Sequence, residues 1–447
     1  MQTKIIFLFF GFFFSAIGFS QEKPMEFTLK EAISYAQQHN YAALNAQRAI
    51  ESAKNKKWET TSIGLPQVHA SIDYQNWLKQ QISLIPAEFF GGNPGDFAEV
   101  SFGTKQNINA SATLSQLLFD GSYLVGLQSA KVFLEISKNA KEKTDLEIKK
   151  AVINAYGNVL LAEESVKILE KNKSALQKNL NETQQIYENG LVEEESVEQL
   201  QITFTSIENS LSNANRLKNL ASKMLNITLG VDLEKNLILK DNLPSLTNQN
   251  IDFSLLETTL NLEGNIDYKI SKNAERAKEL LLKYEKSKAL PRLSAFINGG
   301  YSGYNNEFQF LQNKQRWFGS SLFGVSLNIP IFSSFGRAAK TKQAKINLEI
   351  AKTELTQAEQ QILLQTAKAK SDYQFSIEQY QNRKQNLNLA ERIEKKNQIK
   401  FTEGISSSFE LRQAQQQLYM SQQEYLQSML DVILKKVNLE TILNSKK

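Results

Sequence analysis

The 447-residue sequence contains no cysteine, and only 7 prolines and 2 histidines. Without thiols it can form no disulfide, thiolate nucleophile, zinc–thiolate site or lipidated N-terminal cysteine. No GxGxxG, Walker, GxSxG or HExxH pattern occurs, and the two histidines, His39 and His69, are isolated from each other. We therefore expect no catalytic site, no metal site and no cofactor, and predict that the chain is not an enzyme.

A surplus of charge of one sign is also missing. The sequence has 52 Lys and Arg against 47 Asp and Glu, a formal net charge of +5, and the surplus is spread along the chain. Since no basic patch forms, we expect no nucleic-acid partner. Glycine is sparse at 20 residues, whereas Gln, Asn, Leu and Lys are abundant, a composition typical of long solvated helices.

One strongly apolar run lies near the start, from Ile5 to Phe19, after the single early cation Lys4. With small residues at its end, this segment indicates a secretory signal peptide over residues 1–20, cleaved before Gln21. A transmembrane anchor is the alternative, but the run is short for one and no second anchor follows. We therefore expect an exported protein.

The first mature segment predicts one helix from Thr28 to about Thr61. Its apolar residues recur at intervals of four, three and seven, and Thr28 with Glu31 forms a capping-box pattern. Leu65-Pro66 ends this helix, because proline removes a backbone donor and restricts the residue before it.

Four segments then alternate apolar and polar residues, which predicts four β-strands. They lie around residues 68–75, 108–115, 292–298 and 323–329. A sandwich with one wet face would alternate in the same way. A membrane β-barrel is favoured because aromatic residues crowd the hairpin ends, as in the girdles at a lipid–water interface. The candidate interface residues are Trp77, Tyr301, Trp317 and Phe318, beside Phe89, Phe90, Tyr304, Phe308 and Phe310.

Two long helical hairpins are predicted, each reversing at one glycine. A helix of about 68 residues leads from Asp120-Gly121 to Gly190, and a return helix runs from Val192 to about Leu229. Residues 337–401 and 408–443 repeat this pair around Gly404. A glycine just past a helix supplies the left-handed conformation that other residues resist.

The spacing of these landmarks indicates a duplicated unit. Gly190 and Gly404 are 214 residues apart, and Phe119 and Phe332 are 213 apart. This period is far too long for a solenoid. We predict a first repeat over 21–230, a connector with a shorter helix from about Leu255 to Lys288 within 231–290, and a second repeat over 291–447. The fold class is mainly α with a membrane β-barrel part.

Four strands cannot close a barrel, and open sheet edges are not tolerated in lipid, so the chain must oligomerise. A dimer of eight strands would leave an interior filled by side chains, whereas a trimer of twelve would leave a wet lumen. Small polar residues on one face favour water, namely Ser71, Ser111, Thr113, Ser115, Ser294 and Ser326. We therefore predict a homotrimer with a twelve-stranded barrel, embedded in outer-membrane lipid, and an α-helical barrel in the periplasm.

The ordered motifs of the chain resemble those of the TolC-type outer-membrane efflux protein family. The motifs that carry this resemblance are Thr28-Leu29-Lys30-Glu31-Ala32, Leu65-Pro66-Gln67, Leu118-Phe119-Asp120, Tyr187-Glu188-Asn189-Gly190-Leu191-Val192, Ile329-Pro330-Ile331-Phe332 and Phe401-Thr402-Glu403-Gly404. Each motif alone is weak, but the ordered and duplicated set covers essentially the whole mature chain.

The resemblance implies an outer-membrane channel that serves a tripartite efflux or type I secretion system. Its partners would be a periplasmic adaptor (membrane fusion) protein and an inner-membrane transporter of the RND, ABC or MFS type. By the same likeness, the hairpin tips Gly190-Leu191-Val192 and Gly404-Ile405-Ser406 would contact the adaptor.

The family often closes its tunnel with acidic residues after the second tip. Glu410 matches one such position, whereas Gln413 stands where a second acid is common and Ser406 where a basic residue is common. A ring of three Glu410 carboxylates would attract cations and favour opening, and the alternative is a solvated helix charge. Glu193, Glu194 and Glu195 form a second cluster, whose role is either gating or stabilisation of a helix N-terminus.

Two other function classes explain less of the sequence. A periplasmic coiled-coil structural or adaptor protein accounts for the helices but leaves the four alternating segments unused. A secreted enzyme accounts for neither.

Overall fold

The computed structural model describes residues 25–443. The predicted signal peptide and the last four residues lie outside the described residues. The described chain forms two compact units. The first contains residues 25–40, Ala151–Ile251 and Glu378–Leu434, and the second contains Tyr41–Lys150, Asp252–Ile377 and residues 435–443. Three helices contribute to both units, α3 (Gly121–Glu188), α8 (Gly336–Thr402) and α9 (Ser408–Leu443).

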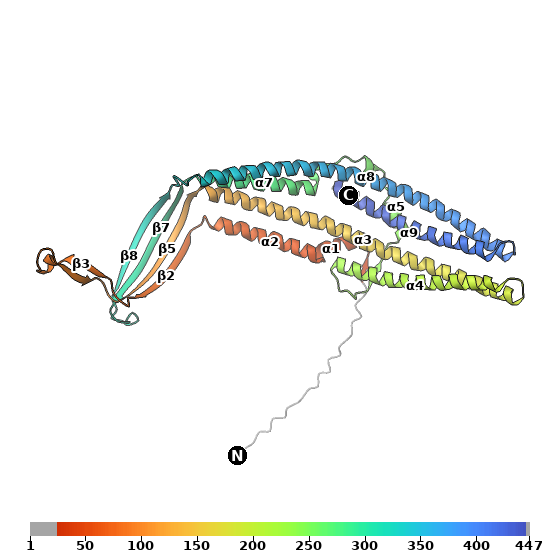
Figure 1. The fold of residues 1–447 in the computed structure, drawn as a ribbon, viewed down its shortest axis with the longest axis horizontal. Coiled ribbons are helices and arrows are strands. Elements are labelled where there is room, and N and C mark those ends of the chain that lie inside the picture. The colour runs from red at the N-terminus through yellow and green to blue at the C-terminus, as the bar shows by residue number, and fades with distance from the viewer. Residues whose placement is uncertain (1–24, 444–447) are drawn as a thin grey trace, which may run out of the picture. The chain divides into compact units, whose positions relative to one another are not determined.

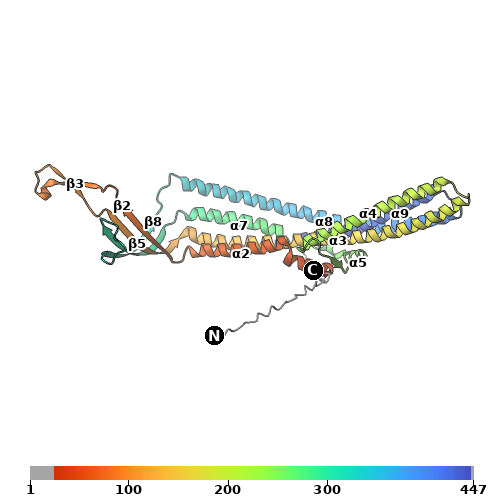
Figure 2. The ribbon, with the colours of Figure 1, turned by 90° about the horizontal axis from the view of Figure 1, so that it is seen from below.

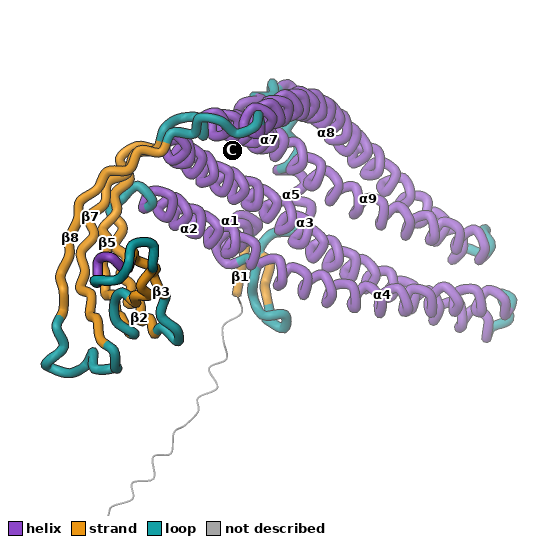
Figure 3. The backbone as a smooth tube through the Cα atoms, turned by 60° about the vertical axis from the view of Figure 1, so that its left-hand side comes forward, coloured by secondary structure: helices purple, strands orange, loops and turns teal. Residues whose placement is uncertain are grey.

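The second unit contains the four predicted strands, paired in one antiparallel sheet (Figure 3). The strand order is β2 (Gln67–Asn76), β5 (Gln106–Asp120), β7 (Arg292–Asn305) and β8 (Trp317–Asn328). Within the described residues, β2 and β8 are the two edges of this sheet and pair with no further strand. The four strands expected from alternation are therefore confirmed, although β5 and β7 are longer than expected.

The strand pairing places apolar residues in rows across one face of the sheet. Val68 lies opposite Leu114, Leu114 opposite Ile297, and Ile297 opposite Phe323. A second row joins Ile72, Ala110 and Tyr301. Val68, Ile72 and Phe323 are each about 70% exposed, at 68%, 73% and 68%. The sheet thus presents a broad apolar face that nothing in the described chain covers.

The other face carries the small polar residues expected from the sequence. Ser71 lies opposite Ser111, with their hydroxyl oxygens 3.3 Å apart. The Asn298 side-chain amide donates to the Thr113 hydroxyl at 2.6 Å. Leucine and phenylalanine also occur on this face. For example, Leu322 lies opposite Asn298. The sheet is therefore amphipathic, with a mixed polar face and a continuous apolar one.

The loop between β2 and β5 contains a second, smaller hairpin that the sequence reading missed. Strand β3 (Ile82–Pro86) pairs with β4 (Phe97–Ser101), and a short 3₁₀ turn, Ala87–Phe90, follows β3. Two five-residue strands, separated by a turn that contains Gly91, Gly92, Pro94 and Gly95, give too short a period to be recognised. We call residues 78–104 the flap.

Two junctions connect the sheet to the long helices. Asp120 ends β5 and caps α3, because its carboxylate accepts from the Ser122 N–H at 2.8 Å and the Tyr123 N–H at 3.2 Å. The pairing of β5 with β7 shifts between Leu117 and Phe119, just before this cap. At the other junction, Ser334 and Phe335 have positive φ angles before α8 begins. The two strand-to-helix motifs therefore differ in local geometry.

The second unit also contains α2 (Tyr41–Ser62) and α7 (Ile266–Ser287). The expected helix from Leu255 to Lys288 is wrong at its start. The chain forms α6 (Ser254–Glu257), a 3₁₀ turn (Leu262–Gly264) and then α7. The break arises because Asn265 caps α7, its side-chain oxygen accepting from the N–H groups of Asp267 and Tyr268.

In the first unit, three short elements pack together at the start of the described chain. Strand β1 (Met25–Phe27) pairs in parallel with β6 (Leu237–Leu239), and α1 (Leu29–His39) follows. Tyr156, which is fully buried, donates to the Phe27 carbonyl at 3.0 Å and the Asp241 carboxylate at 2.9 Å. The same carboxylate accepts from the Leu29 N–H at 2.7 Å. The connector therefore holds the N-terminal segment in place.

The expected single helix from Thr28 to Thr61 is also wrong, although its capping box is confirmed. The helix breaks at Asn40, where the backbone is extended with ψ at 139°. The Asn40 side chain instead donates to the Thr228 carbonyl at 2.8 Å, beside Gly230 at the end of α4 (Glu194–Leu229). A Cβ at Gly230 would lie 2.3 Å from the His39 carbonyl oxygen, so this close approach needs glycine. Tertiary packing overrides helix periodicity here.

Two helical hairpins complete the first unit, and Figures 1 and 2 show α3 beside α4 and α8 beside α9 up to their turns. The α3–α4 seam is a buried apolar cluster with the alternating three- and four-residue spacing of a coiled coil. Its members are Val166, Leu169, Leu176 and Leu180 of α3 and Leu200, Phe204, Ile207 and Ala214 of α4. The predicted coiled-coil hairpins are thus present.

No helix among residues 25–443 combines the length and apolar character that crossing a bilayer requires.

Candidate functional site

The two hairpin tips have the same backbone turn. Gly190 and Gly404 have positive φ angles of 74° and 70°. At the first tip, the Leu191 N–H donates to the Ile186 carbonyl at 3.1 Å, five residues back; at the second, the Ile405 N–H donates to the Lys400 carbonyl at 2.8 Å, again five residues back. This pattern is the Schellman motif, in which glycine takes the left-handed position. The glycine reversals expected from the sequence are confirmed.

Each tip presents one exposed branched side chain directly after its glycine. Leu191 is 76% exposed and Ile405 is 75% exposed. Val192 and Ser406, the next residues, are half-buried. An exposed aliphatic residue at the same place in both turns gives each tip a small apolar contact point.

Hydrogen bonds join the two tips to each other inside the first unit. The Ser196 hydroxyl of α4 donates to the Ser408 hydroxyl oxygen of α9 at 3.3 Å. The Ser408 hydroxyl in turn donates to the Gln199 side-chain oxygen at 3.3 Å. The first turns of α4 and α9 therefore lie side by side.

Glu410 occupies a capping box at the start of α9. Its backbone N–H donates to the Ser407 hydroxyl at 3.3 Å, and its carboxylate accepts from the Ser407 N–H at 3.3 Å and from the Ser406 hydroxyl. The Ser406 hydroxyl, followed by the Ser407 N–H, lowers the pKa of Glu410 below its ordinary value. Glu410 is exposed, and its capping role explains its position.

The other acidic candidates are less ordered. Glu193 precedes α4 without a side-chain capping bond, and Glu194 and Glu195 lie in the first turn of the helix. The Glu195 carboxylate accepts from Gln199 at 2.6 Å. Gln413 is exposed on α9, one turn after Glu410. These carboxylates all lie where the helix dipole favours negative charge.

The sequence reading missed Glu394, a half-buried carboxyl of α8 at the α8–α9 seam. Tyr380, Leu387, Glu394 and Phe401 follow each other at intervals of seven, which places Glu394 at a seam position. Burial raises the pKa of Glu394, and a hydrogen bond from Gln415 partly offsets this rise. Gln415 is itself 2% exposed, and its side-chain oxygen has no hydrogen-bond partner. The seven-residue spacing alone could have revealed this polar pair.

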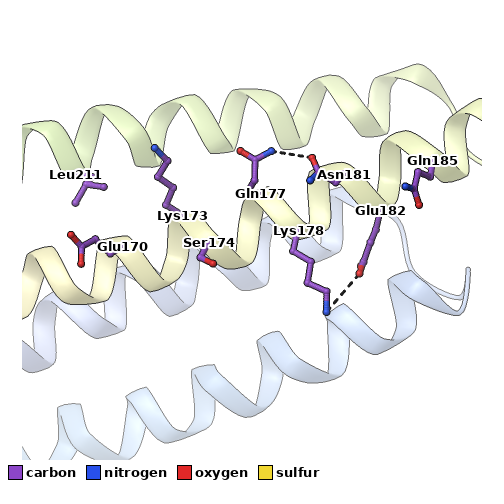
Figure 4. Close-up of a pocket in the computed structure, with 9 residues that line it drawn as sticks. All are labelled: Glu170, Lys173, Ser174, Gln177, Lys178, Asn181, Glu182, Gln185 and Leu211. Carbon is purple, nitrogen blue, oxygen red and sulfur yellow. Dashed lines mark hydrogen bonds and ion pairs between the residues drawn. The ribbon is translucent and has the colours of Figure 1, made fainter.

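A shallow polar groove of about 560 Å³ runs along α3 toward the first tip (Figure 4). It is lined by alternating charges and amides, namely Glu170, Lys173, Ser174, Gln177, Lys178, Asn181, Glu182 and Gln185 of α3, and by Leu211 of α4. Two internal contacts order it, from Gln177 to Asn181 at 3.0 Å and from Lys178 to Glu182 at 3.7 Å. The groove suits the side of an amphipathic helix better than a small molecule.

The candidate interface aromatics lie on both faces of the sheet. Tyr301 and Trp317 belong to the apolar face, opposite Ala110 and Gly303 respectively. Phe318 lies on the other face, with its ring 6.0 Å from that of Tyr304 and the Arg316 guanidinium 5.1 Å above it. Trp77 follows β2, and its backbone N–H donates to the Lys105 carbonyl at 2.9 Å. Only Tyr301 and Trp317 thus share a face with the exposed apolar rows.

Among residues 25–443, no three His, Asp or Glu side chains gather in a way that could hold a metal ion. His39 stacks on Tyr35, with ring centroids 4.0 Å apart, and its Nδ1 lies 3.0 Å from the Tyr35 carbonyl. These contacts are those of a histidine with a structural role.

Comparison with known proteins identifies the fold. Residues 274–445 match a family model described as "Outer membrane efflux protein". A structure of CusC, from a study of transmembrane channel formation, has a TM-score of 0.73 at 18% identity, covering 93% of this chain and 91% of that one. No curated protein sequence matches the chain.

Two further structures share the fold at similar distance. The outer membrane protein VceC from Vibrio cholerae has a TM-score of 0.71 at 14% identity, covering 93% of this chain and 95% of that one. The CmeC outer membrane channel of Campylobacter jejuni has a TM-score of 0.71 at 16% identity, covering 93% of this chain and 85% of that one.

These matches support a mainly helical efflux channel component. The residues of the family match cover most of α7 and all of β7, β8 and α8. Residues 274–445 thus resemble the outer membrane efflux protein family, and the chain shares the fold of the CusC, VceC and CmeC structures.

Proposed function

We propose that three copies of this chain form the outer-membrane channel of a tripartite efflux or type I secretion system. In this proposal, twelve strands close a barrel in the outer membrane and the helices form a tunnel in the periplasm. The channel in this proposal is a passive exit duct. This function requires that the protein carries a signal peptide, is exported and lies in the envelope of a Gram-negative cell.

The observation that carries the proposal is the sheet of the second unit. Its apolar face is exposed in rows, and both edge strands, β2 and β8, lack a partner within the described residues. Open edges and an uncovered apolar face are both unfavourable in water. Pairing β2 of one copy with β8 of the next removes the edges, and lipid covers the apolar face.

The polar face then lines the bore. Ser71, Ser111 and Thr113 lie on this face and already exchange hydrogen bonds with neighbouring side chains. An eight-stranded barrel would have to fill its interior with side chains, and serines are too small for that. A trimer therefore fits these residues better than a dimer. Tyr301 and Trp317 would lie at the lipid–water interface.

The two tips are proposed to contact a periplasmic adaptor. Leu191 and Ile405 are exposed apolar residues at equivalent turns, and the α3 groove beside the first tip has alternating charges that suit a helical partner. The adaptor would in turn bind an inner-membrane transporter of the RND, ABC or MFS type. The transporter would set the exported compound.

The test is an export assay in a strain that depends on this channel. Gly404→Pro together with Leu191→Arg should abolish most export, while the trimer still forms and runs as a heat-modifiable species. Leu220→Arg, on an exposed face of α4 away from the tip, is the matched control and should leave export intact. Normal export with both tips altered would contradict the docking role.

Gating by Glu410 has its own test, because Glu410 both caps α9 and carries charge. Three Glu410 carboxylates around the axis would hold cations and resist crowding. Glu410→Gln removes the charge, whereas Ser407→Ala removes a cap but leaves the charge. We expect Glu410→Gln alone to change single-channel conductance and cation selectivity. Equal currents in both variants and the parent would leave Glu410 as a cap only, and the cluster Glu193–Glu195 can be neutralised in the same assay.

A periplasmic coiled-coil structural or adaptor protein remains the alternative. The heptad spacing of the α3–α4 seam would serve such a protein equally well. Membrane fractionation separates the two. A soluble periplasmic species would support the alternative, whereas an outer-membrane, detergent-requiring trimer supports the channel.

A further inference from the structure

The flap (residues 78–104) projects from the sheet with an apolar surface that its own chain leaves exposed. On one face of its hairpin, Ile82 lies opposite Ser101, Leu84 opposite Glu99, and Pro86 opposite Phe97. Leu84 is 64% exposed, Phe97 65% and Phe89 80%. A 27-residue excursion with this much exposed apolar surface needs a partner of some kind.

The charge of the flap restricts the partner. The flap carries three acids, Glu88, Asp96 and Glu99, against one base, Lys79, at its root. All three acids are exposed, and none forms an ion pair within residues 25–443. An anionic lipid surface would select for basic residues, so it is disfavoured. Contact between identical flaps would bring acids together and is disfavoured as well.

A complementary surface exists on the loop between β7 and β8, residues 306–316. Lys314 and Arg316 are exposed there and form no ion pair among the described residues, and Leu311 is 89% exposed. This loop therefore offers a cation beside an apolar side chain. That combination matches the centre of the flap face, where Glu99 lies opposite Leu84.

The flap and this loop leave the sheet at the same end, because Asn76, Gln106 and Asn305 are consecutive partners across the strands. Within one copy, β2 and β8 are separated by β5 and β7, so their ends are about 14 Å apart at ~4.8 Å per strand. In the proposed closed barrel, β8 of the next copy lies about 5 Å from β2. The neighbour's loop therefore also lies close to the root of the flap.

The copy's own loop is already engaged at that root. The Phe308 and Phe310 rings lie 5.7 Å and 6.1 Å from the Tyr74 ring, and the Lys105 N–H donates to the Asn306 side chain at 3.0 Å. Leu311 and Lys314 take no part in these contacts, and both side chains are exposed.

We propose that the flap of each copy docks on the β7–β8 loop of the adjacent copy, with Glu99 facing Lys314 and Leu84 contacting Leu311. This inference rests on the proposed trimer. The three docked flaps form a belt between neighbours at the outer end of the barrel, and the belt holds the copies together beyond the strand pairing.

The test uses the absence of cysteine from the chain, which leaves no background thiol. The double variant Glu99→Cys, Lys314→Cys is oxidised in isolated outer membranes and run without reductant. We expect a covalent trimer as the main species. The control is the pair Glu99→Cys, Thr402→Cys. Both positions are exposed but lie in different units, so this pair should stay uncrosslinked.

A charge exchange gives a second readout. Glu99→Lys and Lys314→Glu, each alone, should lower the temperature at which the trimer dissociates in detergent, and the double exchange should restore it. A stable trimer without the covalent bond and without rescue overturns the flap proposal while leaving the channel intact. A parent chain that forms no trimer overturns both.

Discussion

The two helical hairpins of the first unit share a turn but differ in their seams. Both reverse at a left-handed glycine with the same five-residue backbone hydrogen bond. Between α3 and α4 the buried cluster from Val166 to Ala214 is apolar, and Lys173 forms an ion pair with Glu208 at 2.8 Å. The α8–α9 seam instead contains Glu394 beside Gln415.

This difference shows that the fold of a helical hairpin and its stability depend on different residues. A seven-residue repeat and one glycine are enough to form either hairpin, and polar residues can occupy the seam without changing the fold. Such residues lower stability, because a half-buried carboxyl must either lose hydration or take up a proton. We therefore expect α8–α9 to open more readily than α3–α4.

The largest effect should come from shortening a seam leucine of the first hairpin. Leu200 is 2% exposed within the apolar cluster, so Leu200→Ala should cost about 3 kcal/mol of unfolding free energy. Leu418→Ala, at a less buried seam position of α9, should cost less. Segment-resolved hydrogen exchange measures both. Equal protection of the two parent hairpins would remove the contrast.

Replacing the tip glycine by alanine should lower the unfolding free energy by the same amount at both hairpins. Gly190→Ala and Gly404→Ala each place a Cβ in open space, so only the left-handed backbone is penalised, by about 1 kcal/mol. Chemical denaturation of each variant gives the two values. A clear inequality would mean that the tips are not equivalent turns.

Neutralising Glu394 should stabilise the second hairpin. Because the native pKa is raised, the protonated form is favoured by folding, and this stability is complete below the ordinary glutamate pKa and is lost as pH rises through the raised value. Glu394→Gln should therefore be more stable than the parent chain at pH 7 and equally stable near pH 4. Glu391→Gln, on the exposed face of α8, is the control.

The smallest effect concerns the α9 cap, and acid acts on it in the opposite direction. The lowered pKa of Glu410 means that its contribution is present above the ordinary glutamate pKa and is lost as pH falls. Ser407→Ala should cost about 0.5–1 kcal/mol, whereas Glu193→Ala at the uncapped α4 should cost little. Faster exchange at residues 408–411 below pH 4 would accompany the loss.

The sequence predicted the elements that depend on local patterns and missed those that depend on distant contacts. Alternation revealed β2, β5, β7 and β8, and the glycines revealed both tips. The break at Asn40 could not be predicted, because it depends on a bond to Thr228 and on contact with Gly230. The pairing of β1 with β6 joins three-residue strands 212 residues apart in sequence, and such strands have no detectable period.

The candidate site divides in the same way. Leu191 and Ile405 could be found because they follow the tip glycines, and the capping box of Glu410 was present as Ser407-Ser408-Phe409-Glu410. The flap was overlooked because its two strands have only five residues each, too few to show a clear alternation. The split of the aromatics between faces required the strand register, which alternation within single strands does not provide.

The central claim is that the sheet of one chain is a third of a barrel. The most direct measurement is the mass of the detergent-solubilised complex by native mass spectrometry. We predict three copies of the mature chain, which requires detergent to stay in solution. A monodisperse single copy that is stable in buffer without detergent would contradict the account.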